Sequence, residues 1–189
     1  MPADRPVNCP DLPDGDLWVF GYGSLMWRPG FEFIEAAPAK IYGFRRALCL
    51  WSVVYRGTPE KPGLVFGLAA GGSCLGRAFR VRRSNSASVL HYLWQREMIK
   101  QAYVPTLLDL HIDEKIRPGL AFVVDTSHPQ FVDELSDERI ASILTRSRGR
   151  GGPNRDYFLE CLDHLEEMGV CTKRYQHIKR RLQQQRAPG

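Results

Sequence analysis

Short apolar runs of strand length, separated by turn residues, fill the first part of the chain. Four such runs occur, at residues 17–21, 38–50, 63–70 and 75–81. The first run (LWVFG) ends in glycine, as a buried strand does. The turn-rich segment 56–63 (RGTPEKPG) divides the second run from the third, and Gly71 and Gly72 are predicted to form a tight turn before the fourth. This pattern predicts consecutive β-strands.

The spacing of the apolar residues becomes helical within residues 86–100. The residues that recur at helical intervals there are Val89, Leu90, Leu93 and Trp94. Two strands and then three helices are predicted further on, at residues 103–112, 120–124, 137–146, 155–168 and 172–185. The Gly- and Arg-rich residues 146–154 are predicted to be the longest flexible loop. Strands first, one inserted helix and helices at the end predict an α+β fold with an antiparallel sheet or barrel.

The composition is that of an ordinary globular protein, with 43% hydrophobic and 25% charged residues. We expect residues 1–16, which are rich in Pro and Asp, to be a loose leader, and residues 17–189 to be a single domain. No apolar stretch approaches the ~20 residues of a membrane span. The five cysteines include no CxxC pair, so neither a disulfide framework nor a zinc site is indicated. A reducing cytoplasm is the expected location.

The net charge is +5, and the excess of basic residues is largely at the C-terminal end. The basic residues that gather there are Lys173, Arg174, Lys179, Arg180, Arg181 and Arg186. We interpret this segment as a solvated helix and tail, because no nucleic-acid recognition motif accompanies it. A mildly basic body also suits an anionic small substrate. We therefore expect no nucleic-acid or membrane partner; the oligomeric state stays open, with a monomer favoured.

The first candidate for chemistry is the turn that follows the first predicted strand. Its six residues are Phe20, Gly21, Tyr22, Gly23, Ser24 and Leu25. Glycines on both sides of one tyrosine allow the backbone to bend tightly and to approach another group closely. Successive N–H groups of such a turn can converge on an anion or on a carbonyl oxygen. The alternative is a tight turn without a ligand, and the motif lacks the further glycine or lysine of a nucleotide-binding loop.

The second candidate is Glu97, which lies on the apolar side of the predicted helix 86–100. A carboxylate among apolar side chains is costly unless it is paired or functional. Burial there raises its pKa, as a general base working near neutral pH requires. One alternative is a buried ion pair with an arginine, for example Arg45, Arg46 or Arg77; another is that the helix ends early and exposes Glu97.

Other residues offer weaker candidates. The five histidines show no ligand spacing, so we expect no metal, and no cysteine lies in a nucleophile motif. Ser24 lacks the Gly-x-Ser-x-Gly elbow of a serine nucleophile. Arg56, beside Gly57 and a Pro-rich turn, can clamp a substrate carboxylate. It is equally a candidate for a solvated loop arginine, which the residues alone favour.

Several segments in the same order resemble the ChaC-type γ-glutamylcyclotransferases, the branch associated with glutathione. The matching segments are residues 19–27 (VFGYGSLMW), 43–47 (GFRRA), 56–58 (RGT), 93–103 (LWQREMIKQAY) and 152–157 (GPNRDY). The resemblance runs from Leu17 to the final helices. It implies a small antiparallel β-barrel surrounded by helices.

The resemblance also implies a division of labour among the candidates. The turn would hold the γ-glutamyl group through Tyr22, Gly23, Ser24 and Leu25, and Glu97 would transfer the proton. We assign the neighbouring Phe20 and Gly21, together with Arg56, to the same binding site. The implied reaction cyclises the γ-glutamyl group of glutathione to 5-oxoproline and releases Cys-Gly, without a metal or organic cofactor.

Two alternatives remain from the sequence. One is a cyclotransferase that acts on another γ-glutamyl-amine. The other is a non-catalytic module that binds a γ-glutamyl group or an anion, and that regulates a membrane transporter through the basic C-terminal segment.

Overall fold

The computed structural model describes residues 6–98, 102–133, 135–170 and 172–184. The chain packs as two compact units. The first, here called the barrel unit, comprises Met1–Ala47 and Gly67–His128. The second, the helical unit, comprises Leu48–Phe66 and Pro129–Gly189. Whether the two behave as the single domain expected from the sequence stays a prediction.

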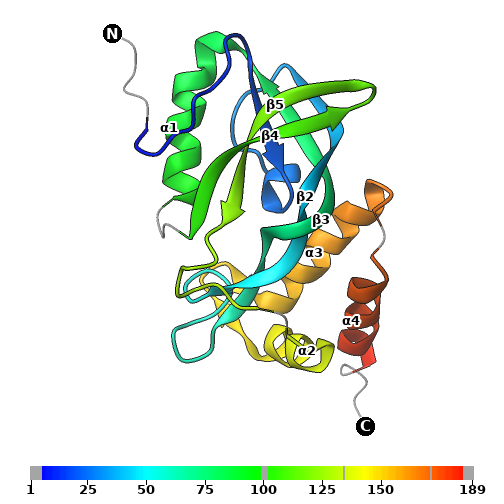
Figure 1. Cartoon of the computed structure of the whole chain (residues 1–189). Helices are drawn as coiled ribbons and strands as arrows, with labels where there is room; N and C mark the ends of the chain where they lie inside the picture. The colour runs from blue at the N-terminus through cyan, green and yellow to red at the C-terminus, as the bar shows by residue number, and fades with distance from the viewer. Residues whose placement is uncertain (1–5, 99–101, 134, 171, 185–189) are drawn as a thin grey trace. The chain divides into compact units, whose positions relative to one another are not determined.

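The barrel unit is built on five strands that close into a barrel (Figure 1). The strands are β1 (Leu17–Gly21), β2 (Glu35–Ser52), β3 (Gly63–Val81), β4 (Tyr103–Ile112) and β5 (Lys115–Val124), in the spatial order β1-β3-β2-β4-β5. β3 pairs antiparallel with β1, and β4 pairs antiparallel with both β2 and β5. At the closure β1 runs parallel to β5, with Val19 opposite Leu120. The expected small barrel in an α+β fold is confirmed, with this one parallel pair added.

The predicted tight turn at Gly71 and Gly72 is wrong, because β3 runs without interruption from Gly63 to Val81. Both glycines have positive φ, +94° and +73°, which non-glycine residues rarely adopt. They lie against Arg45 of β2, whose guanidinium donates to the Ala70 carbonyl. A long strand in a small barrel has to bend, and glycines supply that bend without reversing the chain.

Helix α1 (Ser86–Glu97) packs its apolar side against the barrel, as its spacing predicts. Val89, Leu90 and Leu93 are buried in a cluster with residues of β1 and β5. The Trp94 ring lies edge-on to the Phe122 ring, with 5.6 Å between centroids. Burial of such side chains stabilises the helix by roughly 1.5–3 kcal/mol each, which fixes the end of α1 on the barrel.

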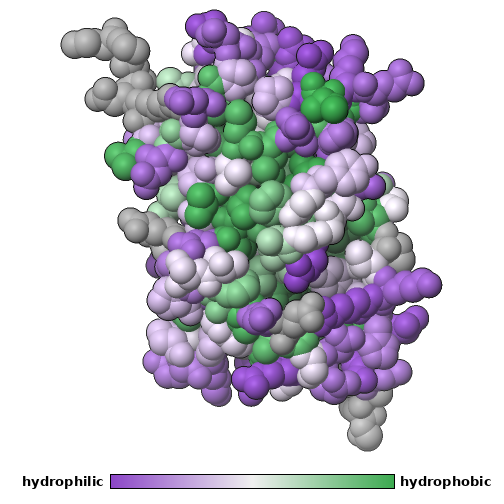
Figure 2. All heavy atoms as spheres, in the orientation of Figure 1, coloured by the Kyte–Doolittle hydropathy of each residue, from purple (hydrophilic) through white to green (hydrophobic). Residues whose placement is uncertain are grey.

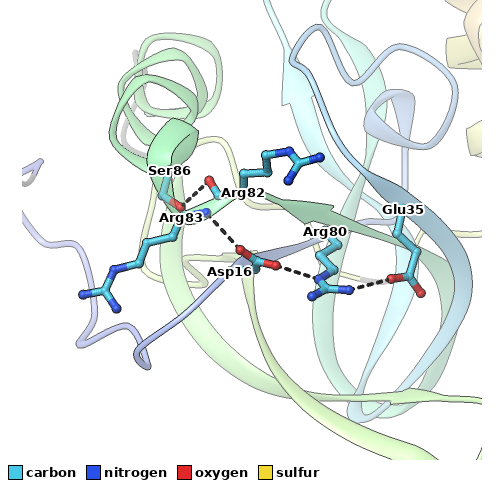
Figure 3. Close-up of polar contacts among 6 residues, drawn as sticks. All are labelled: Asp16, Glu35, Arg80, Arg82, Arg83 and Ser86. Atoms are coloured by element: carbon cyan, nitrogen blue, oxygen red, sulfur yellow. Dashed lines mark hydrogen bonds and ion pairs between the residues drawn. The ribbon is translucent and has the colours of Figure 1, made fainter.

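Asp16 joins the start of β1 to the segment that leads into α1 (Figure 3). Its carboxylate lies 2.8 Å from Arg80 Nε and accepts the Arg83 N–H at 3.0 Å, at the start of the short helix η2 (Arg83–Asn85). Arg80 also pairs with Glu35, at 3.3 Å. The Arg83 N–H, together with Arg80, holds the pKa of Asp16 below its usual range.

The described part of the expected leader, residues 6–16, has no helix or strand. It nevertheless contacts α1, because the Trp94 Nε1–H donates to the Val7 carbonyl at 2.9 Å. Cys9 and Leu12 pack beside the same apolar cluster as α1. This segment therefore rests on the barrel unit.

The helical unit contains three helices and a two-stranded hairpin. Its elements are α2 (Asp137–Arg146), β6 (Arg148–Gly149), β7 (Gly152–Pro153), α3 (Asn154–Glu167) and α4 (Lys173–Gln184). The flexible loop predicted for residues 146–154 is therefore wrong. The Arg150 and Gly151 N–H groups donate to the Val54 and Tyr55 carbonyls, both at 2.8 Å, which holds the hairpin on the neighbouring loop.

Asn154 supports the helical unit from within. Its side chain is fully buried and pairs with both backbone groups of Leu64, accepting from the N–H and donating to the carbonyl, each at 2.7 Å. Nearby, the Phe66 ring contacts the rings of Tyr157, Phe158 and Tyr175. A buried amide used in this way replaces the missing strand partner of Leu64.

The basic segment forms a helix with an exposed basic side, as expected from the sequence, but its other side is buried. Arg186 of the expected tail lies outside the described residues. The buried side of α4 consists of Tyr175, Ile178 and Leu182. Its cations pair with acids of α2 and α3: Arg174 with Asp137, Arg181 with Glu138, and Lys179 with Asp163 and Glu166. Hydrophilic residues gather over α4 in Figure 2, but much of their charge is balanced by these partners. Among the described helices, none is long and apolar enough to cross a membrane.

Candidate active site

The glycine-flanked turn leads from β1 into the short helix η1 (Ser24–Met26). The side chains of Phe20, Tyr22 and Leu25 are buried in the core of the barrel unit, and the Tyr22 hydroxyl donates to the Phe122 carbonyl at 2.9 Å. Gly23 and Ser24 are only half-buried. Any group that approaches the turn from solvent therefore meets Gly23 and Ser24 first.

Gly21 is required because the turn folds back on itself. A Cβ at this position would lie 3.0 Å from Leu25 Cβ and 3.2 Å from the Met26 nitrogen. The Met26 N–H donates to the Gly23 carbonyl at 2.9 Å and so closes the first turn of η1. Among the described residues, none accepts a hydrogen bond from the N–H of Ser24 or of Leu25. These two groups are the first donors of the helix, which leaves them available to an acceptor.

Two arginines of the barrel strands hold the backbone of the turn. Arg46 donates from Nε to the Tyr22 carbonyl at 2.6 Å and from Nη2 to the Leu75 carbonyl at 2.7 Å. Arg77 donates to the Met26 carbonyl at 3.2 Å. Both were considered from the sequence as ion-pair partners of Glu97. They fix the turn instead, through charge-assisted hydrogen bonds to its carbonyl groups.

Glu97 is the last residue of α1, so the helix ends before the predicted residue 100, but Glu97 is not exposed as that alternative expected. Its side chain is 18% exposed, and Oε1 lies 3.1 Å from Nε of Arg96. The alternative of a buried ion pair with an arginine is therefore confirmed in part: within the described ranges the partner is Arg96, and no pair is formed with Arg45, Arg46 or Arg77. Burial raises the pKa of Glu97, while the charge and hydrogen bond of Arg96 oppose part of that rise. Such a carboxylate can exchange a proton near neutral pH.

Arg96 connects Glu97 to the turn, and the sequence analysis did not single it out. Its Nη2 donates to Ser24 Oγ at 2.9 Å, while its Nε contacts Glu97. The two candidate segments, more than 70 positions apart in the chain, are thus joined by one guanidinium. The available sequence signal was modest: a cation next to the candidate acid.

Arg56 belongs to the helical unit, whereas the turn and Glu97 belong to the barrel unit. Its guanidinium donates to the Gly151 carbonyl and lies 5.1 Å from the centroid of the Tyr157 ring. Its N–H donates to Ser52 Oγ at 3.0 Å. Arg56 is thus a half-buried loop arginine that has a carbonyl and an aromatic ring as partners, which a purely solvated side chain would lack. Its role in substrate binding stays a prediction.

The described His, Cys, Asp and Glu side chains include no group of three placed to hold a metal ion. A small cavity of about 160 Å³ lies beside the leader, with Leu12, Trp18, Leu107 and Pro118 in its lining. The cavity contains none of the residues that the sequence analysis assigned to the site. Glu97 and the turn stay the candidates for acid–base chemistry in the barrel unit.

The ChaC-like protein family matches residues 17–186, which is nearly the whole chain. The chain is 34% identical over 158 residues to the glutathione-specific gamma-glutamylcyclotransferase of Escherichia coli, covering 83% of this chain and 68% of the relative. It is 32% identical over 174 residues to the protein of the same name from Schizosaccharomyces pombe, covering 81% and 86%. This protein belongs to the ChaC-like family.

Solved structures support the same fold. A gamma-glutamyl cyclotransferase specific to glutathione from yeast superposes with a TM-score of 0.79 at 19% identity, covering 91% of this chain and all (100%) of the other. YkqA from Bacillus subtilis superposes with a TM-score of 0.58 at 20% identity, covering 89% of this chain and 54% of the other. At these identities the likeness is one of fold.

Proposed function

We propose that this protein cyclises the γ-glutamyl group of glutathione to 5-oxoproline and releases Cys-Gly, with Glu97 as the residue that transfers the proton. The observation that carries the proposal is the buried carboxylate of Glu97, joined through Arg96 to the glycine-flanked turn. Membership of the ChaC-like family supports it, as do relatives that are named glutathione-specific gamma-glutamylcyclotransferases.

The substrate supplies the nucleophile, which is the α-amino group of its γ-glutamyl moiety. That amine is largely protonated at neutral pH and has to lose a proton before it can attack. A carboxylate of raised pKa such as Glu97 accepts this proton. The free amine attacks the γ-carbonyl carbon, a C–N bond forms, and a five-membered ring closes. Because the reaction is intramolecular, a site that holds the substrate folded lowers much of the barrier.

The turn is proposed to bind the γ-glutamyl group mainly through its backbone. The side chains of Phe20, Tyr22 and Leu25 are buried in the core, so they hold the turn in place by packing. The N–H groups of Ser24 and Leu25 are suited to stabilise the oxyanion that forms when the amine attacks. As the amide C–N bond breaks, protonated Glu97 returns its proton to the leaving amine of Cys-Gly. The ring nitrogen carries one extra proton after the attack, and it loses this proton to the regenerated Glu97 carboxylate and then to solvent.

Arg56 is proposed to pair with a carboxylate of the substrate, in addition to its contacts with Gly151 and Tyr157.

The cytoplasm is the proposed location, because scattered cysteines without paired spacing suit a reducing compartment. The expectations of a monomer, and of no nucleic-acid or membrane partner, stay proposals. Three basic residues of α4, Arg174, Lys179 and Arg181, pair with acids, which weakens the case for a regulatory module that acts through that segment.

Product analysis with two substrates tests the proposal. Purified protein is incubated with glutathione, and in parallel with a γ-glutamyl-amine that lacks the Cys-Gly part. The proposal expects 5-oxoproline and Cys-Gly in equal amounts from glutathione, and much slower turnover of the second compound. Preference for the second compound would mean that the enzyme is a cyclotransferase for another γ-glutamyl-amine. If glutathione bound but no 5-oxoproline formed, the non-catalytic binding module would be the remaining alternative.

A further inference from the structure

Arg96 makes contacts to three segments of the barrel unit at once. Nη2 donates to Ser24 Oγ at 2.9 Å, and Nη1 donates to the Arg28 carbonyl at 2.6 Å and to the Pro29 carbonyl at 3.3 Å. Nε lies 3.1 Å from Oε1 of Glu97. Each of the three guanidinium nitrogens therefore serves a different segment: the turn, the loop after it, and the end of α1.

The guanidinium itself is held in one orientation. Nη1 also lies 3.1 Å from the hydroxyl of Tyr92, one helical turn earlier on α1, and the Arg96 side chain is 21% exposed. Because a guanidinium is planar and its five N–H bonds have fixed directions, these contacts set both its position and its tilt. A lysine ammonium carries the same charge on one nitrogen and cannot span the three segments.

We propose that Arg96 is a positioning residue, which fixes the Glu97 carboxylate relative to the Ser24 turn so that one substrate can contact both. The inference rests on the proposed function, because it assigns the acid and the turn to one reaction. Its physical basis is that proton transfer and ring closure both depend on geometry, and a misplacement of about 1 Å can cost about 100-fold in rate. Arg96 acts through Glu97 and Ser24 and needs no contact with the substrate.

The charge of Arg96 has a second consequence that can be measured separately. Burial raises the pKa of Glu97 and the Arg96 guanidinium opposes that rise, so removal of this charge moves the pKa further upward. Among the described residues, Arg96 supplies the cation within ion-pair distance of Glu97. On the same helix, Tyr92 contributes its hydroxyl to Arg96, and from the turn side Arg28 contributes its backbone carbonyl. The positioning role and the charge are separable, because lysine retains only the charge.

The test compares Arg96→Lys and Arg96→Gln with the wild type in kcat, KM and the pH profile of kcat/KM. We expect both variants to lose about 10- to 100-fold in kcat. The acidic limb of the profile should stay in place for Arg96→Lys and move to higher pH for Arg96→Gln. A matched control is Arg83→Gln, since the Arg83 side chain is 71% exposed and lies outside the site; its kinetics should be those of the wild type.

Ser24→Ala removes the contact between turn and guanidinium while leaving Arg96 in place. We expect it to lower kcat as well, and the double variant with Arg96→Lys to lose less than the product of the two single losses, because both remove the same contact. Circular dichroism establishes that the variants are folded. Wild-type kcat and KM in folded Arg96→Lys would overturn the positioning role, as would strictly multiplicative losses. A wild type that makes no 5-oxoproline would instead refute the proposed function before any variant is compared.

Discussion

Arg96 and Glu97, consecutive residues at the end of α1, form an ion pair of 3.1 Å although neighbouring positions on a helix do not usually face each other. Glu97 lies at the C-terminal end of α1, where the helix dipole is unfavourable to an anion. Burial and this position both favour the neutral carboxyl group, whereas Arg96 favours the carboxylate. The balance leaves an acid whose proton can be moved in either direction.

Replacing Glu97 by Gln should abolish turnover of glutathione without unfolding the protein. Glutamine keeps the shape and a hydrogen-bond acceptor for Arg96 but cannot accept the proton of the α-amine. Steady-state kinetics should give less than about a tenth of the wild-type rate, the smallest loss compatible with removal of general-base catalysis. Substrate binding, followed by calorimetry, should largely remain. A rate above that tenth would remove Glu97 from the catalytic role.

The same substitution should make the protein more stable at neutral pH. The folded-state pKa of Glu97 is raised by burial, so the folded protein holds the proton more tightly than the unfolded chain does. Stability is therefore lost as the pH rises from the ordinary glutamate pKa of about 4.3 through the raised folded value. The Glu97→Gln variant does not lose this stability, because glutamine does not ionise.

Melting curves between pH 4 and pH 8 measure this effect. We expect the Tm of Glu97→Gln to exceed that of the wild type at pH 7.5, where the wild type has lost this stability. The difference should shrink toward pH 4, where wild-type Glu97 is protonated. A gap that is independent of pH would mean that the buried charge is not its source.

Asn154→Ala should destabilise the helical unit. The substitution leaves both the N–H and the carbonyl of Leu64 buried without their partner, at a cost of about 2–4 kcal/mol. Urea denaturation should show the loss as a lower midpoint. Asn85→Ala is the matched control, because its amide makes only exposed contacts, with Ser84 and Glu32, and should cost less than about 1 kcal/mol. Equal losses in the two variants would contradict this account of Asn154.

Arg56→Ala should raise the KM for glutathione and also lower the Tm. The first effect follows from the proposed pairing with a substrate carboxylate, the second from the lost contacts with Gly151 and Tyr157. We expect a several-fold rise in KM, since an exposed charge pair contributes about 1 kcal/mol or less. A lower Tm with an unchanged KM would leave Arg56 with the structural role alone.

Local periodicity was enough to predict much of the helix that bears the candidate acid. The residues predicted to face the core, Val89, Leu90 and Leu93, are buried, and Glu97 ends the same helix. Periodicity predicts the buried side of a helix because residues three and four positions apart lie on the same side of it. The turn at residues 20–25 was found for a similar reason, since its two glycines lie within one short segment.

What sequence patterns missed depends on tertiary contacts. Arg96 acquires its role from Ser24 and Arg28, 72 and 68 positions away. Gly71 and Gly72 were predicted to reverse the chain. Instead they lie within β3, because a long strand has to bend when the sheet closes into a barrel. The ion pairs of α4 were not predicted, because nothing local to its basic residues reveals the acids of α2 and α3.

The source of the nucleophile is the central claim, and substrates without a free α-amine test it most directly. An amidase that activates water does not need that amine, whereas a cyclotransferase does. N-acetyl-glutathione should give neither 5-oxoproline nor Cys-Gly, although its acetyl group adds bulk near Gly23 and Ser24. The des-amino analogue, in which hydrogen replaces the α-amine, adds no bulk and gives the decisive measurement: release of Cys-Gly over time. The account predicts no release above the uncatalysed background, with glutathione turned over in parallel. Release at a rate near that of glutathione would contradict it, because Glu97 would then be activating water.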